Sequence, residues 1–194
     1  MITQLEIFFS TKCYFLTFIL IVLIAAVLRF YKFAEVPHGM TWDEAAIGYN
    51  GYAVVTTRRD EWLTFLPLSF KSFGDFKAPF AIYLNGLFTA VLGLELWVVR
   101  LPFALSGILA VVGTMLLTKT LLGKHPRSEL GSLLVGFAVA VSPWHMHFTR
   151  TGFESGLALT MVIWGVYLFV HSWTQEKFRS LKLAGSVGLL ILSL

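Results

Sequence analysis

The sequence predicts an all-α polytopic membrane protein: a transmembrane helix bundle with a large first external loop that carries interfacial helices. Hydrophobic residues make up 57% of the 194 residues and charged residues only 13%, whereas a soluble domain carries roughly 25% charged residues. The mean hydropathy is +0.76. The net charge of +4 comes from scattered basic residues, which does not indicate a nucleic-acid surface. A single cysteine, Cys13, excludes a disulfide framework within the chain and a Cys-based zinc site.

The first apolar run is predicted to be a span near 13–30. It lies between Lys12 and Arg29, whose long side chains can extend toward the membrane surfaces. A cleaved signal peptide is the alternative, because Ala25-Ala26 loosely imitates a cleavage site. Glu6 in the leader disfavours cleavage. We therefore expect an uncleaved helix that enters from the cytoplasm.

The next segment, 31–99, is predicted to be the external loop, because it is rich in acids, prolines and glycines. Within it, Ala45–Val55 has helical spacing but is too short to span, which suits an interfacial helix. The apolar stretch Phe80–Leu94 fits either a span or a second interfacial helix.

The distribution of basic residues decides between these two readings. Basic residues gather at 119–127 and at 177–182, and cytoplasmic loops carry an excess of Lys and Arg. Both basic loops are cytoplasmic only if Phe80–Leu94 lies along the interface, so we expect that arrangement. The further spans are then predicted near 100–119, 129–147, 155–172 and 182–194. The chain ends within an apolar run, so we expect 1–194 to be the N-terminal part of one longer membrane-embedded domain.

The acidic pair Asp43-Glu44 stands out in a chain with few charges. One reading is a helix cap, with Thr41 or Asp43 satisfying free N–H groups ahead of a helix. The other is an active-site base with an acidic neighbour at the lipid–water boundary. Adjacent helical residues point about 100° apart, so one acid can work while the other holds the loop.

Three further places carry polar groups on the predicted external side. Asp75 and Lys77 precede Pro79, which fits a turn before a helix or a phosphate site. Arg100 opens a span, where it can anchor the interface or pair with Asp43 or a phosphate. The last place is the segment from Ser142 to Glu154, which includes Arg150. Its histidines, His145 and His147, are two apart and so are not expected to share a metal.

The order of these motifs is more specific than each alone. It reads as an acidic pair after the first span, Lys-x-Pro, then Arg-Leu-Pro opening a span, then Ser-Pro and Thr-Arg-x-x-x-Glu before another. This order, from about Leu28 to Trp173, resembles the polytopic GT-C-type glycosyltransferases that use lipid-phosphate-linked sugars. The nearest likeness is to bacterial relatives of the protein O-mannosyltransferases and of the aminoarabinose transferases.

The resemblance implies an inverting transferase that moves a sugar from a polyprenyl-phosphate donor to a hydroxyl acceptor on a lipid, glycan or protein. It implies that Asp43 is the catalytic aspartate and Glu44 its companion. Lys77 would approach the donor phosphate, and Arg100 would pair with the first-loop aspartate. Glu154 would be a second external-loop acid. The expected location is a bacterial inner membrane.

The sequence departs from the family pattern at two positions near Lys77. Ala78 stands where the family has the first proline of Lys-Pro-Pro, and Asp75 lies two positions before Lys77 instead of directly before it. Asp75, Glu154 and Arg150 are expected to bind substrate together with Lys77 and Arg100. No cofactor is indicated with certainty, and a divalent metal ion on Asp43, Asp75 and Glu154 is left open.

A rival class is a non-enzymatic transporter or flippase-like module for the same lipids, since charges at the membrane edge also mark substrate paths. Transporters more often show internal repeats, and the sequence shows none. Hydrolysis that depends on Asp43, with water as the acceptor, is a third reading.

Overall fold

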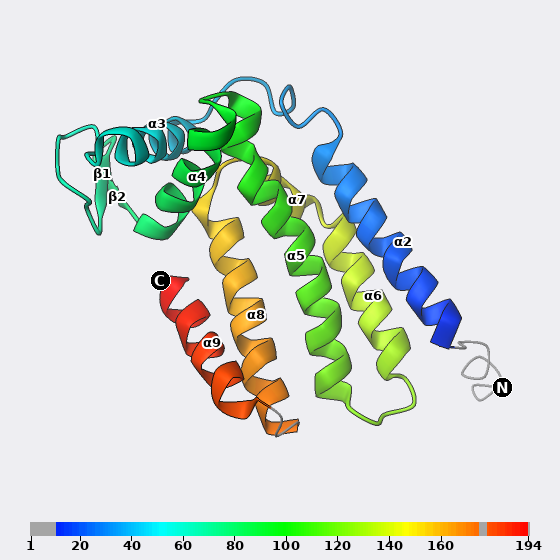
Figure 1. Ribbon diagram of the computed structural model, residues 1–194. Helices are drawn as coiled ribbons and strands as arrows, with labels where there is room; N and C mark the ends of the chain where they lie inside the picture. Colours follow the sequence, from blue (N-terminus) through cyan, green and yellow to red (C-terminus); the bar gives the residue numbers. More distant parts are fainter. Residues whose placement is uncertain (1–10, 175–177, 194) are drawn as a thin grey trace.

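The computed structural model describes residues 11–174 and 178–193. These residues form eight α-helices and one two-stranded hairpin (Figure 1). The expected all-α polytopic membrane protein is confirmed. Three residues on which the predictions of an uncleaved first helix, a basic loop and the last span depend lie outside the described residues: Glu6, Lys177 and Leu194.

Three helices of the described part are long and apolar enough to cross a membrane: α2 (Thr11–Phe30), α5 (Leu96–Leu122) and α8 (Glu154–Thr174). Two shorter helices, α6 (Ser128–Val141) and α9 (Arg179–Leu192), run beside them. In Figure 1, α5 lies between α6 and α8, α2 packs outside α6, and α9 packs on α8. The apolar runs in the sequence therefore become parallel and antiparallel neighbours in one bundle.

The structure differs from the predicted single span at 129–147. Helix α6 ends at Val141, Ser142 is extended, and Pro143 opens a separate short helix, α7 (Pro143–Arg150). A proline disfavours helical backbone at the residue before it and is well tolerated at the first position of a new helix. The apolar run therefore breaks at Ser142-Pro143, and α7 lies at the end of the bundle where α2 ends and α8 begins (Figure 1).

The loop between α2 and α5 holds α3 (Trp42–Thr57), β1 (Phe70–Ser72), β2 (Asp75–Lys77) and α4 (Pro79–Leu92). The hairpin of β1 and β2 is not among the predicted elements. The loop also ends earlier than predicted, because α5 already begins at Leu96.

Helices α3 and α4 pack directly on each other at the end of the bundle (Figure 1). Their contact depends on Gly51 and Gly86. A Cβ on Gly51 would lie 2.8 Å from the Gly86 nitrogen, and one on Gly86 would lie 2.5 Å from the Gly51 oxygen. The absence of side chains at both positions lets the two backbones touch.

An apolar core fastens this loop to the bundle. It joins Ile47 of α3, Phe70 of β1, Ile82 of α4, Phe103 of α5 and Leu157 of α8. Phe70, Ile47, Ile82 and Phe103 are fully enclosed. Burial of such side chains stabilises by about 1.5–3 kcal/mol each. The loop is therefore a packed layer on the membrane helices, and side chains on α3 and β2 are held at fixed positions.

Candidate active site

Helix α3 begins with a reciprocal cap between Thr41 and Glu44. The Thr41 hydroxyl accepts a hydrogen bond from the Glu44 N–H at 3.2 Å, and the Glu44 carboxylate accepts one from the Thr41 N–H at 2.8 Å. This capping box satisfies two of the free donors at the helix start. Of the two residues proposed as cap, the structure selects Thr41. Asp43 makes no capping bond and is available for another role.

Arg100 and Glu44 form a fully buried ion pair, with the Arg100 Nε 2.6 Å from the Glu44 Oε1. Arg100 Nη2 also donates to Glu44 Oε2 at 3.3 Å. The Gly152 N–H adds a further bond to the same carboxylate, at 3.2 Å. Burial raises the pKa of the Glu44 carboxyl, but the bonds from Arg100, Thr41 and Gly152 outweigh it, and the pKa lies below its ordinary value of 4.5. The expected proximity of Arg100 to the acidic pair is confirmed.

Arg100 has no donor left for a phosphate. Its remaining N–H groups bond to the backbone oxygens of Phe33, Pro37 and Gly39, at 2.7 to 3.1 Å. A guanidinium has five N–H donors, and all five are taken. The prediction that Arg100 binds substrate is therefore not met by this geometry, and its acidic partner is Glu44, not Asp43. Arg100 holds the segment after α2 onto α5.

Arg150 is used in a similar way. It donates to the backbone oxygens of Leu28, Tyr31 and Val36, at 2.7 to 3.0 Å. These bonds tie α7 to the start of the loop and use three of the five N–H donors of Arg150, so its role as a substrate ligand stays a prediction. A guanidinium serves this purpose because its fixed fork of donors can reach several carbonyls at once.

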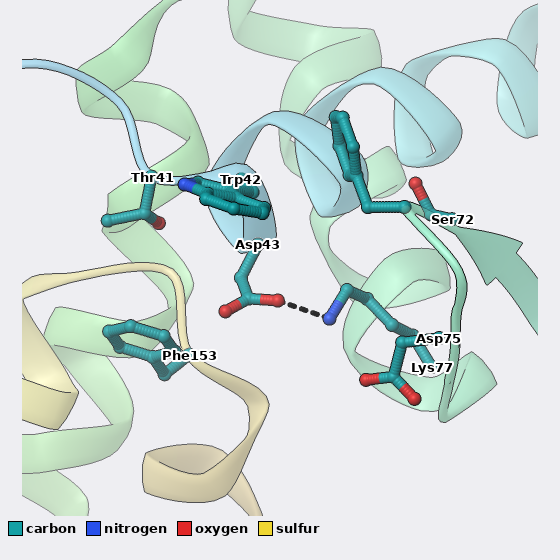
Figure 2. Close-up of a pocket in the computed structure, with 8 residues that line it drawn as sticks. Thr41, Trp42, Asp43, Ser72, Asp75, Lys77 and Phe153 are labelled. Carbon is teal, nitrogen blue, oxygen red and sulfur yellow. Dashed lines mark hydrogen bonds and ion pairs between the residues drawn. The ribbon is translucent and has the colours of Figure 1, made fainter.

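Asp43 and Lys77 form the second ion pair, between the first turn of α3 and the end of β2. The Lys77 side chain is only 6% exposed, whereas that of Asp43 is 36% exposed. The hairpin register explains how Lys77 arrives there, because Lys77 pairs with Phe70, whose ring is buried in the core. A cation and the more accessible carboxylate are thereby held in contact at the end of the bundle (Figure 2).

Asp43 and Lys77 open onto a pocket of about 370 Å³ (Figure 2). Its lining combines acids, a lysine, hydroxyls and three aromatic rings: Thr41, Trp42, Asp43, Ser72, Phe73, Asp75, Lys77 and Phe153. Trp42 and Phe73 are in edge contact, with ring centroids 6.2 Å apart, and both are more than 60% exposed. The buried Ser72 hydroxyl has no partner among the described residues.

Sequence reasoning assigned no role to Trp42, Ser72, Phe73 or Phe153. The signal for Trp42 was its place next to Asp43. No comparable signal exists for Phe153, which reaches the pocket from the loop between α7 and α8. Gly152 was also missed, because its contribution is a backbone N–H.

Asp75 and Glu154 are the other two acids predicted for the site, and both lie near the ion pair. Asp75 lines the pocket and accepts a bond from the Phe76 N–H at 2.7 Å. Glu154 is the first residue of α8 and is not one of the residues that line this pocket. Its charge interacts with those of Lys77, Asp43 and Asp75. Its Oε2 is buried and has no hydrogen-bond partner among the described residues. The predicted acids are thus brought near one another.

The described acids near the ion pair do not form a set of ligands for the metal ion left open above. Across residues 11–174 and 178–193, no group of three or more His, Cys, Asp or Glu side chains has the geometry to hold a metal ion. One oxygen of Asp43 is bonded to Lys77, so Asp43 already has a cation beside it.

Comparison with known protein families gives a match to the chain. The profile of the family described as Dolichyl-phosphate-mannose-protein mannosyltransferase matches residues 76–193. The matched range covers more than half of the chain and includes Lys77, Arg100 and Glu154, while Asp43 and Glu44 precede it. No curated protein and no solved structure matches the chain.

Proposed function

The chain belongs to the dolichyl-phosphate-mannose-protein mannosyltransferase family, and we propose that Asp43 and Lys77 form the catalytic centre of its glycosyl transfer. The family makes the chain a GT-C-type glycosyltransferase and an integral membrane protein. We propose further that the donor is a polyprenyl-phosphate-linked sugar and the acceptor a hydroxyl on a lipid, glycan or protein. The proposed location is a bacterial inner membrane, with the N-terminus in the cytoplasm and Asp43 on the external face.

One observation carries the proposal: an accessible carboxylate and a nearly buried ammonium meet at a pocket with an aromatic and polar lining. Helix α3 and the hairpin of β1 and β2, which carry most of the residues that line the pocket, lie at the end of a bundle of membrane helices (Figure 1). A polyprenyl chain can remain in the bilayer there while its sugar reaches the pocket. Aromatic faces such as that of Trp42 combine a large apolar area with few rotatable bonds, which suits the flat faces of a sugar ring.

The residues act in one displacement that inverts the anomeric carbon. The acceptor oxygen attacks that carbon while Asp43 removes its proton. The bond from the anomeric carbon to the phosphate oxygen breaks, and the electron pair leaves with the phosphate. Lys77 has three donors, one of which bonds to Asp43, so the others can stabilise the departing phosphate. Glu44 is enclosed and fully bonded, and we assign it to positioning Asp43 instead of to the chemistry.

The test is the Asp43→Asn variant of the complete protein in membranes, assayed by transfer of radiolabelled sugar from polyprenyl phosphate. Asn keeps the size of Asp and removes the base, so transfer should fall by about 10²–10⁴-fold, while donor binding persists. Glu95→Gln is a matched control, because Glu95 is an exposed acid before α5 without a hydrogen bond from its side chain to the helix. Undiminished transfer by Asp43→Asn at matched expression would remove Asp43 from the reaction.

A transporter for the same lipids and a hydrolase are the two alternatives, and the same assay separates both from a transferase. A transporter would move the lipid across vesicles without forming a glycosylated product. Release of free sugar in the absence of any acceptor would instead favour hydrolysis.

A further inference from the structure

Arg29 is a buried cation, and no described residue provides an opposite charge next to it. Its side chain is fully enclosed at the end of α2. Its donors go to neutral groups: the Thr149 hydroxyl at 3.2 Å, the backbone oxygens of Ala25 and Ala140 at 3.1 and 3.2 Å, and the His145 ring at 2.7 Å. Among the described residues, no carboxylate lies within ion-pair distance of it. A buried charge without compensation is costly, so this place favours an anion.

The contact with Arg29 fixes the tautomer of His145. A guanidinium can only donate, so the His145 Nδ1, 2.7 Å from Arg29 Nη2, is the acceptor. A neutral imidazole that accepts at one nitrogen carries its proton on the other. The His145 Nε2 is therefore a donor, and it has no hydrogen-bond partner among the described residues. The residue is 7% exposed, so a missing partner there is unusual.

His145 also lines two hollows on the bundle. One, of about 640 Å³, is an apolar groove between α5, α6 and α8, with walls that include Leu117, Leu134, Val139 and Ile163. The other, of about 280 Å³, lies beside Trp144, Phe148 and Gly156. The groove follows helices that belong to the membrane part of the chain. The lining is mainly apolar, which suits an apolar chain, and His145 is one of its few polar members.

We propose that this groove binds a bilayer phospholipid with an anionic headgroup. The acyl chain lies between α5, α6 and α8, and a phosphate oxygen accepts the proton of His145 Nε2. Arg29, one imidazole ring behind that proton, supplies the charge complementarity that selects an anionic over a zwitterionic lipid. Because Nε2 is covered in the free protein, the headgroup must displace part of the wall to reach it. The site is separate from the pocket at Asp43 and does not depend on the proposed transfer.

The discriminating variant is His145→Asn. An asparagine oxygen can take the place of Nδ1 and keep the bond from Arg29, while the Nε2 donor is lost. His147→Asn is the matched control on the same helix, because the His147 ring has an edge contact with Phe148 and a tilted contact with Phe153. It is not among the hydrogen-bond partners of Arg29. A second variant, Ala138→Trp, fills the groove without touching the polar end, and Leu130→Trp is its control on an exposed part of α6 away from the groove.

Binding is measured on the purified chain in detergent by native mass spectrometry. The probes are phosphatidylglycerol, phosphatidylcholine, polyprenyl phosphate and inorganic phosphate. Wild type should bind phosphatidylglycerol, and His145→Asn should bind it about 10- to 100-fold more weakly. Ala138→Trp should also lose binding, whereas both controls should keep it, at unchanged thermal stability in lipid-free detergent. Equal binding of phosphatidylcholine, binding of polyprenyl phosphate or inorganic phosphate alone, or undiminished binding by His145→Asn would overturn the proposal.

Discussion

Replacement of Glu44 by Gln should release the first loop from the bundle. The substitution keeps the size of the side chain and removes the charge, so Arg100 is left as an uncompensated cation in a fully enclosed site. The amide nitrogen would also face donors where Glu44 accepts bonds from Arg100, Thr41 and Gly152. Removing one member of a buried ion pair costs about 3–5 kcal/mol, which corresponds to a roughly 10²- to 10⁴-fold larger open population of the loop.

Hydrogen exchange measured by mass spectrometry in detergent reports that population directly, because amides exchange through local opening. The Thr41 and Gly152 amides, which donate to Glu44, should exchange faster in Glu44→Gln by the same factor. Glu35→Gln is the matched control. Glu35 pairs with Lys32 at 3.9 Å, and both side chains are more than half exposed, so exchange should change less than about fivefold. If Glu44→Gln changes exchange no more than Glu35→Gln, the ion pair does not hold the loop.

Two further predictions concern the same loop and the orientation of the chain. The pKa of Glu44 is lowered in the folded protein, so its contribution is present above the ordinary carboxyl pKa and is lost as the pH falls through the folded value. The Thr41 amide should therefore lose protection at acidic pH in wild type, and a pH-independent protection would contradict this assignment. For topology, a cysteine introduced near His125 in a Cys13→Ser background should be labelled only from the cytoplasm, and one near Asp60 only from outside. Labelling of both from one side would refute the proposed interfacial position of α4.

The sequence predicted the helices well because each membrane helix is a continuous apolar run, a local property. It failed at Ser142-Pro143, where hydrophobicity continues across a backbone break, so composition suggested a span to residue 147 and only the proline signalled the end of α6. The hairpin at Phe70–Lys77 was missed for a different reason. Three-residue strands carry too little alternation to distinguish them from a turn, and their pairing is seen only in the folded chain.

At the candidate site, the order of the motifs predicted which residues lie close together. Only the structure shows which of them form ion pairs with one another. Arg100 was expected near the acidic pair, and it is, but spacing along the sequence cannot distinguish Asp43 from Glu44 as its partner. The capping box decides, because it turns Glu44 inward toward Thr41 and Arg100. Asp43, one residue earlier, then projects toward β2 and Lys77.

Arg100 and Lys77 differ in how many of their donors are already used, and this difference indicates which cation can meet a donor phosphate. The N–H groups of Arg100 are all occupied by the loop and Glu44, so a phosphate cannot recruit them without unfolding the loop. Lys77 is the cation among the described residues that line the pocket, and one of its three donors bonds to Asp43. Under the proposed function, the other two donors of Lys77 can bond to the donor phosphate while the first holds Asp43 beside the leaving group. The second oxygen of Asp43 then accepts the proton of the acceptor hydroxyl.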